Sequence, residues 1–410
     1  MATRSRITAS KIQRKPNTGG AVEGKLASSK SASRRGRAAV STIQRPPQQK
    51  VMVMQGGGAV GAFHLGVYQA LHEGDKEPDW VIGTSIGAIN AALIAGNQPH
   101  HRLARLRAFW ERMHARQAVH GGFAMWPSMS ALVHAQHRLG VVTQGIPDFF
   151  KPHWPAWFNA RQSLGIEKAA YYDTQPLRDT LAELVDFDYL SRSPIRITVG
   201  AVNARTGQMR YFDSRDERLG VDHIMASGAL APAFGAVRIE GDPYWDGGLY
   251  SNTPVEVVLD DKPRRDSLIF ACRLWEPHGD EPQSIWDVQG RLKDIQFASR
   301  AESHIKRQRQ LHRLRHVIQE LAQMVPDSAH ARELGAWGCK TVMHVVSLMA
   351  PHLPGEDQTK DIDFTPRGVR LRSEAGLHLG RKALAEMPWE VEVDPLDGVC
   401  VHRVELEPTP

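Results

Sequence analysis

The chain has 410 residues, of which 41% are hydrophobic, 23% charged and 7% aromatic, and its formal net charge is +6. This composition is typical of a globular protein and excludes fibrous, wholly disordered and membrane-embedded classes. The three cysteines, Cys272, Cys339 and Cys400, have neither CxxC nor Cys/His spacing, so the sequence predicts no disulfide framework and no metal site.

The positive charge is concentrated in the first 50 residues. They hold 12 Lys and Arg residues against one acidic residue, Glu23, whereas the rest of the chain holds 39 basic and 44 acidic residues. Because the segment is rich in Ser, Gly, Gln and Pro and poor in large apolar residues, residues 1–49 are expected to form a disordered basic tail. An organelle transit peptide, an arm that binds anionic membrane and a passive extension are the alternatives for its role.

The tail also bears on localisation. It lacks the apolar core of a secretory signal peptide, so we expect a cytoplasmic protein, with peripheral contact to an anionic membrane as an open alternative. The chain carries no signature of specific nucleic-acid recognition.

A strand, a glycine loop and a helix open the folded part of the chain. The apolar run Val51–Met54 precedes Gly56-Gly57-Gly58, and residues 59–71 are small and apolar over the length of a helix. A second unit of the same kind follows, with a strand expected at 80–82 and a helix at 88–95. Alternating strands and helices predict an α/β protein with a mainly parallel, helix-covered sheet.

The remaining elements are expected from periodicity and composition. Residues 100–170 mix Arg, His, Trp and Pro and are expected to form an insertion of helices and loops over the edge of the sheet. Strands are expected at 195–202 and 267–272, and a helix at 222–230. A long helix is expected at 294–324, where four apolar residues recur at helical spacing: Leu311, Leu314, Ile318 and Leu321.

The turn after the second strand has the pattern of a nucleophile elbow. Gly83-Thr84-Ser85-Ile86-Gly87 places a serine on a sharp strand-to-helix turn, where the glycines let two backbones approach closely. The helix N-terminus there favours developing negative charge. The alternative is a structural turn that happens to contain serine. A membrane-spanning helix is not expected at residues 80–96, because this segment is too short and too polar.

Gly56-Gly57-Gly58 can serve as an oxyanion hole, because its backbone N–H groups converge after a strand and before a helix. The spacing Gly56-x-Gly58-x-x-Gly61 also fits dinucleotide binding. Dinucleotide binding requires an acidic residue at the end of a second strand about 20 residues later. This chain has the Ser85 turn at that place instead, which argues for hydrolysis. The third motif, Asp246-Gly247-Gly248, by itself predicts only a turn.

Together these blocks resemble the patatin-like phospholipase family, bacterial branch, over about Val51 to Leu259. Two further blocks contribute, namely Ala226-Ser227 with Pro232 and Phe234, and Asn252-Thr253-Pro254. The resemblance implies a three-layer α/β/α fold and hydrolysis of lipid acyl esters without metal or other cofactor. It implies Ser85 as nucleophile, Asp246 as base in a Ser-Asp dyad, and an oxyanion hole at Gly56, Gly57 and Gly58. Family members often have Arg or Lys where this chain has Val60.

The chain is expected to divide into a basic tail (1–49), a patatin-like catalytic domain (50–275) and a largely helical C-terminal extension (276–410). The extension looks similar, over about 294–384, to one seen in a bacterial subgroup of the family. Two runs carry this resemblance, Asp294-Ile295-Gln296-Phe297 and Lys360-Asp361-Ile362-Asp363-Phe364. Basic residues on its long helix form a face that is either solvated or in contact with lipid: Arg300, Lys306, Arg307, Arg309, Arg313 and Arg315.

We therefore expect a serine acyl-ester hydrolase that acts on lipid. Another apolar ester, such as an acylglycerol, a thioester or a hydroxyalkanoate, is the alternative substrate. A Ser-Asp-His triad would need a late histidine such as His278, His344 or His352. The alternative outside the enzymes is a membrane-associated scaffold protein that has the same fold but no catalytic activity.

Overall fold

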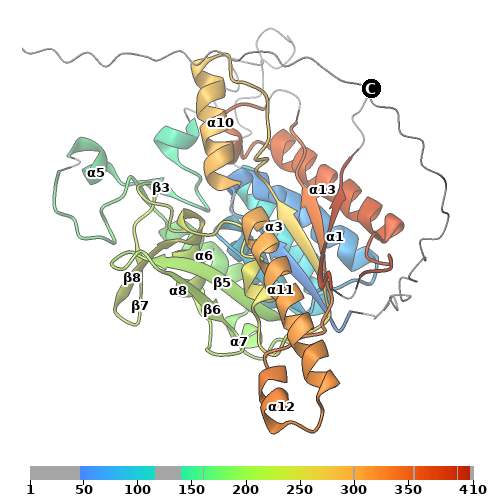
Figure 1. Cartoon of the computed structure of the whole chain (residues 1–410). Coiled ribbons are helices and arrows are strands. Elements are labelled where there is room, and N and C mark those ends of the chain that lie inside the picture. Colours follow the sequence, from blue (N-terminus) through green and yellow to red (C-terminus); the bar gives the residue numbers. More distant parts are fainter. Residues whose placement is uncertain are drawn as a thin grey trace, which may run out of the picture. The chain divides into compact units, whose positions relative to one another are not determined.

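The computed structural model describes residues 47–115, 140–159, 161–298, 301–353, 356–394 and 396–406 (Figure 1). Nearly all of the expected basic tail, residues 1–49, lies outside the described residues, so its predicted disorder stays a prediction. Arg300 of the expected basic face also lies outside them.

A nine-stranded sheet runs through the described part of the chain. The six strands from β11 to β5 are parallel, whereas β6, β8 and β7 are antiparallel to their neighbours, which confirms the mainly parallel sheet. The order across the sheet is β11 (Val399–Val404), β10 (Met343–Met349), β9 (Ser267–Arg273), β1 (Gln49–Met54), β2 (Trp80–Gly83), β5 (Arg196–Asn203), β8 (Asp242–Asp246) and β7 (Val237–Ile239), with β6 (Met209–Asp213) paired to β5.

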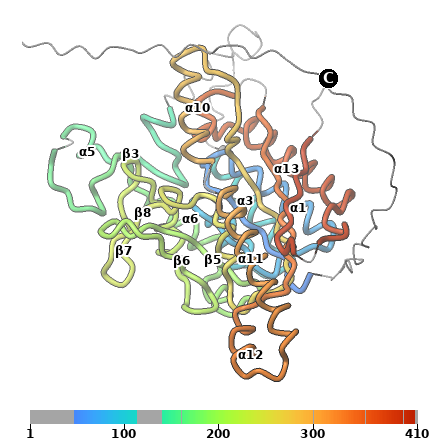
Figure 2. Tube along the Cα trace, viewed as in Figure 1, coloured from blue at the N-terminus to red at the C-terminus, as the bar shows by residue number. Residues whose placement is uncertain are grey.

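Helices cover both faces of this sheet, because successive side chains of its central strands enter two different cores. In β1, Val51 and Val53 join one core and Met52 and Met54 the other. The first core includes residues at α9 (Glu256–Leu259) and α11 (Ala301–Met324), and the second those of α1 (Ala62–Glu73), α2 (Ile86–Ala95), α3 (Pro99–Ala115) and α13 (Pro366–Glu386). The result is the expected three-layer α/β/α fold (Figure 2).

Further helices and a second, two-stranded sheet complete the described part of the chain. The expected helix at 222–230 is α8 (Val221–Ser227), and the expected insertion contributes α3 and a two-stranded antiparallel sheet. No helix in the described ranges is long and apolar enough to span a membrane. The remaining elements are β3 (Lys151–Pro152), α5 (Trp154–Phe158), β4 (Tyr172–Asp173), α6 (Gln175–Leu184), α7 (Phe187–Leu190), α10 (Ile285–Phe297), α12 (Ala329–Gly335) and the 3-10 helices η1 (Gly58–Gly61), η4 (Gly247–Leu249) and η5 (Lys360–Ile362).

The single helix expected at 294–324 is two helices, because α10 ends at Phe297 and α11 begins at Ala301. At the end of α10, the backbone carbonyl of Phe297 accepts hydrogen bonds from the side chains of Gln55 and Asn252, at 3.0 and 2.8 Å. These side chains lie far away in the sequence, and they satisfy a carbonyl that a helix end leaves free. The break is therefore stabilised by tertiary contacts that local periodicity does not show.

The expectation that α11 is buried through its apolar stripe is also wrong in part. Leu314 and Leu321 are exposed, whereas Gln308, His312 and His316 are buried. The Gln308 side chain donates to the Asp260 carboxylate, and His312 hydrogen-bonds Thr341. Polar contacts, together with the apolar packing of Ala301 and Ile305, therefore hold this helix on the sheet in place of Leu314 and Leu321.

The C-terminal segment is joined to the rest of the fold by strand pairing and by helix packing. β10 pairs in parallel with β9 from Met343–Ser267 to Met349–Arg273. Helix α13 lies along α1, where the two helices approach at glycines (Figures 1 and 2). A Cβ built on Gly66 would lie 1.8 Å from the carbonyl oxygen of Ser373, and one on Gly376 would lie 2.1 Å from that of Phe63.

We predict that Gly66→Ala lowers the free energy of unfolding by about 1–3 kcal/mol or more, because the added methyl group must push α13 away from α1. The measurement is urea denaturation. The matched control is Gly290→Ala in α10, where the nearest atom lies 3.6 Å from the added Cβ. It should leave stability unchanged or raise it by up to about 1 kcal/mol through helix propensity. Equal loss in both variants would contradict the prediction.

Candidate active site

Ser85 lies between β2 and α2 in a strained backbone conformation. Its φ is 57° and its ψ is −124°, a region that few residues with a side chain adopt. The Ser85 N–H donates to the backbone carbonyl and to the hydroxyl of Ser227, both at 3.1 Å. Hydrogen bonds to Ser227 thus stabilise the turn. The Ser85 side chain lies at the end of β2, as in a nucleophile elbow.

The two flanking glycines are required by close backbone packing. A Cβ on Gly83 would lie 2.2 Å from the carbonyl oxygen of Gly87, and a Cβ on Gly87 would lie 2.1 Å from that of Met54. The elbow therefore needs glycine on both sides of Ser85 to bring α2 down against β1 and β2.

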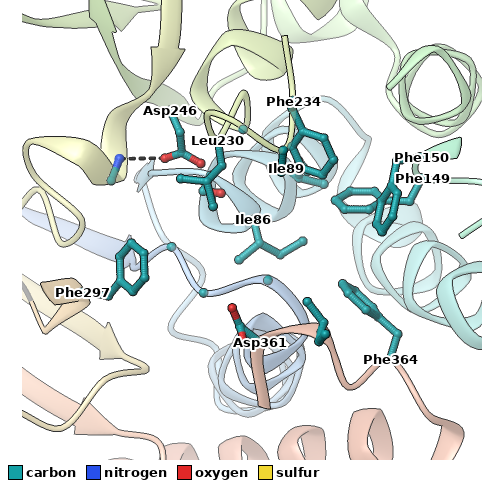
Figure 3. Close-up of a pocket in the computed structure, with 18 of the residues that line it drawn as sticks. Ile86, Ile89, Phe149, Phe150, Leu230, Phe234, Asp246, Phe297, Asp361 and Phe364 are labelled. Atoms are coloured by element: carbon teal, nitrogen blue, oxygen red, sulfur yellow. Dashed lines mark hydrogen bonds between the residues drawn. The ribbon is translucent and has the colours of Figure 1, made fainter. Parts of the chain in front are cut away.

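Asp246 lies at the end of β8, where β8 pairs with the C-terminal half of β5. Its carboxylate is buried, with the residue 2% exposed, and it accepts a hydrogen bond of 2.7 Å from the Gly248 N–H (Figure 3). Burial raises the pKa of Asp246 to about 6, against the lowering effects of the Ser85 side chain and the Gly248 N–H. A carboxylate with this pKa can exchange a proton near neutral pH.

The glycine loop divides into one occupied and two free amides. The Gly56 N–H donates to the backbone carbonyl of Asn252 at 3.2 Å, so it is already engaged. The Gly56 carbonyl accepts from the Asn252 amide at 3.0 Å and from the Trp275 indole at 2.8 Å. For the N–H groups of Gly57 and Gly58, the described residues supply no acceptor, and both glycines line the same cavity as Ser85.

This cavity has a volume of about 180 Å³ and brings the predicted residues together: Gly56, Gly57, Gly58, Ser85 and Asp246 all line it. Away from the polar end its walls are almost wholly apolar. Figure 3 shows Ile86 and Ile89 between Asp246 and a group of phenyl rings. The apolar lining residues are Ile86, Ile89, Val141, Val142, Phe149, Phe150, Leu230, Ala233, Phe234, Phe297, Ile362 and Phe364.

No histidine is among the described residues that line the cavity. His344 in β10 stacks on His402 in the edge strand β11, with ring nitrogens 3.0 Å apart. His278 and His352 are exposed and lie beside Glu276 and Glu356. The histidines that a triad would require are therefore placed outside the cavity.

The described residues contain no group of three or more His, Cys, Asp and Glu side chains that could hold a metal ion. The polar end of the cavity instead offers a hydroxyl, one buried carboxylate and backbone amides. This set suits nucleophilic acyl chemistry, in which a serine attacks and amides hold the resulting oxyanion.

Eight of the 23 described residues that line the cavity come from two segments outside the catalytic motifs. The insertion supplies Val141, Val142, Phe149 and Phe150, and the C-terminal segment supplies Phe297, Asp361, Ile362 and Phe364. The four residues of the insertion come from a segment without clean periodicity. The run Asp361-Ile362-Asp363-Phe364 stands out in the sequence only through the resemblance of the C-terminal extension.

Comparison with protein families identifies two matching segments. Residues 52–259 match the model described as patatin-like phospholipase, and residues 295–396 match one described as patatin phospholipase. No curated protein matches the chain at a significant level.

Several solved structures show weak similarity. VipD from Legionella pneumophila is 14% identical with a TM-score of 0.38, over 83% of this chain and 67% of that one. The type III effector protein ExoU is 15% identical with a TM-score of 0.30, over 83% of this chain and 53% of that one. ExoU from Pseudomonas aeruginosa in complex with SpcU is 18% identical with a TM-score of 0.28, over 82% of this chain and 52% of that one. The chain thus spans about half the length of the ExoU chains.

We predict that Asp246→Asn stabilises the protein above pH 6. The folded state holds the Asp246 proton up to about pH 6, whereas an unperturbed aspartate has a pKa of 3.8. Between these values the folded state binds more protons than the unfolded state, so the contribution of Asp246 to stability falls as pH rises, by about 3 kcal/mol in all. Asparagine removes this cost and can still accept from Gly248.

The measurement is the difference in unfolding free energy between the variant and the wild type, from urea denaturation at pH 4 and pH 8. The variant should gain on the wild type as pH rises. A difference that is the same at both values would contradict the raised pKa.

Proposed function

We propose that Ser85 and Asp246 are the catalytic dyad of this chain, which belongs to the patatin-like phospholipase family and is a lipid hydrolase. The single observation that carries the proposal is the convergence of a strained serine, a buried carboxylate and two free amides on one apolar cavity. The Ser85 side chain is close enough to the Asp246 carboxylate to lower its pKa.

In the first half-reaction, the Asp246 carboxylate accepts the Ser85 hydroxyl proton while Ser85 Oγ attacks the acyl carbonyl carbon. The carbonyl oxygen gains the negative charge, and the Gly57 and Gly58 N–H groups donate hydrogen bonds to it. The intermediate then collapses, the ester C–O bond breaks, and the leaving alcohol takes the proton from Asp246. The acyl group remains on Ser85.

In the second half-reaction, Asp246 accepts a proton from water, whose oxygen attacks the acyl-serine carbonyl carbon. The same amides hold the oxyanion. Collapse breaks the bond to Ser85, which regains its proton from Asp246, and the free acid leaves. The raised pKa of Asp246 suits both proton transfers, because a base is most useful when its pKa lies near the working pH.

The apolar walls of the cavity support an acyl chain as the part of the substrate that enters it. A phospholipid is the substrate class that we propose, since the family is that of the phospholipases. The alternatives are an acylglycerol, a thioester and a hydroxyalkanoate. Faster hydrolysis of one of these than of a phospholipid would identify it as the substrate instead.

We further propose that the protein meets lipid through α10. Five apolar residues on this helix are half to three-quarters exposed: Ile285, Trp286, Val288, Leu292 and Ile295. Such a stripe beside a polar face is typical of a helix that lies in a bilayer surface. The same helix ends at Phe297, which lines the cavity, so a lipid surface on α10 would lie next to the site of cleavage.

The basic face of α11 is less suited to this contact. Arg309 and Arg313 form ion pairs with Asp397, and Arg315 is partly buried beside Arg264, which together with burial lowers the pKa of Arg315. Two of these basic side chains are therefore already paired with a carboxylate, and the third is partly buried, so all three are less available to lipid headgroups.

We predict that Ser85→Ala and Asp246→Asn each lower kcat/KM for a soluble ester by at least about 1000-fold, as loss of a group that acts in a catalytic unit does. Wild-type kcat/KM should rise with pH through about 6 as Asp246 ionises. The measurements are ester hydrolysis from pH 4 to 9 and labelling of Ser85 by a fluorophosphonate.

The matched controls are His278→Asn and His352→Asn, which should retain full activity because these side chains lie outside the cavity. Hydrolysis that persists in Ser85→Ala, or that disappears in either histidine variant, would count against the dyad.

We predict that Ile285→Asp combined with Leu292→Asp weakens binding to phosphatidylglycerol vesicles at least about tenfold, because two charges would have to enter the lipid boundary. Hydrolysis of a soluble short-chain ester should not change, since neither residue lines the cavity. Lys306→Glu on α11 serves as the control for charge. Loss of vesicle binding in that control, with none in the α10 variant, would transfer the contact to α11.

A further inference from the structure

A phenylalanine from the C-terminal segment closes the deep end of the cavity. Phe364 is 2% exposed, and its ring centroid lies 5.8 Å from that of Phe149. The Trp110 ring stacks behind it at 6.3 Å and is 1% exposed. Phe149 in turn makes an edge contact with Phe234. Since these rings pack on one another, the cavity ends in an aromatic wall (Figure 3).

The path from Ser85 to this wall is apolar. Ile86 and Ile89 follow Ser85 on one side of α2, and both are buried and line the cavity. In Figure 3 they lie between Asp246 and the rings of Phe149 and Phe364. An acyl chain attached to Ser85 that follows the apolar lining therefore passes over the two isoleucines and meets the aromatic wall.

Two buried or half-buried ion pairs hold the chain just before Phe364. Lys360 is buried and pairs with the Asp294 carboxylate of α10 at 2.8 Å. Lys293 of the same helix pairs with Asp361 at 2.7 Å. Breaking a buried pair leaves an uncompensated charge, so these contacts resist displacement of η5.

A second set of contacts holds the chain just after Phe364. The Arg372 guanidinium is 2% exposed and donates to the backbone carbonyl of Asp363 at 2.8 Å. The Thr365 hydroxyl accepts from the Gly368 N–H at 3.0 Å and caps α13. Because Phe364 is fixed on both sides, its ring is a rigid stop rather than a movable gate.

We propose that Phe364 is a specificity-determining residue that limits the length of the acyl chain, so that the C-terminal segment sets which acyl chains of a lipid ester the cavity accepts. The proposal rests on the proposed function of Ser85, which places the acyl carbonyl at the other end of the path. It assigns to the segment at 295–396 a direct part in substrate selection.

The test compares kcat/KM for p-nitrophenyl esters from butyrate to palmitate in wild type, Phe364→Ala and Phe364→Leu. The wild type should prefer the short esters. In Phe364→Ala the ratio of kcat/KM for the long esters to that for butyrate should rise at least about tenfold, because removing a ring opens room for several methylene groups. Phe364→Leu, which keeps most of the packing volume, should give a smaller rise in the same direction.

Phe187→Ala is the matched control, since Phe187 packs against the same core but does not line the cavity. It should leave the chain-length ratio unchanged even if it lowers stability. A wild type that prefers palmitate, or an unchanged ratio in both Phe364 variants, would overturn the inference while Ser85→Ala stays inactive. Hydrolysis that persists in Ser85→Ala would instead overturn the proposed function together with the inference.

Discussion

The amide group of Asn252 joins the three parts of the chain that meet at the cavity. Its nitrogen donates to the carbonyl of Gly56 in the glycine loop and to that of Phe297 at the end of α10, while its own backbone carbonyl accepts from the Gly56 N–H. Asn252 is 3% exposed, so an unmade hydrogen bond here would cost about 1–3 kcal/mol. Engaging Gly56 in this way leaves the Gly57 and Gly58 amides as the free donors of the loop.

A second constraint is the buried carboxylate beside this amide cluster. An unpaired charge is expensive away from water, and Asp246 has one N–H donor and one hydroxyl near it rather than a cation. The same lack of compensation raises its pKa towards neutrality. Asp246 thus reduces stability at the residue that we propose as the base, and such a trade of stability for activity is common at active sites.

The polar end of the cavity could be predicted from the sequence, because short motifs encode local backbone geometry. Gly83 and Gly87 are needed where β1, β2 and α2 come into contact. The five-residue motif from Gly83 to Gly87 therefore predicts the serine turn. The apolar end could not be predicted, because its rings come from Phe149, Phe234 and Phe364. They carry no shared spacing and meet only after the sheet and both covering layers have formed.

The sheet explains why the C-terminal segment reaches the site at all. β9 lies directly beside β1, β10 beside β9 and β11 beside β10, and none of these three strands falls in the segment at 52–259 that matches the patatin-like model. Residues that follow β10 therefore return to the same edge of the sheet where Ser85 and the glycine loop lie, and η5 packs its Asp361 carbonyl against Gly58. The side chains of this wall can vary without disturbing the elbow, because they belong to α10, to η5 and to the loop after η5, and not to β2 or α2. In the function that we propose, substrate range and catalytic chemistry therefore belong to different parts of one fold.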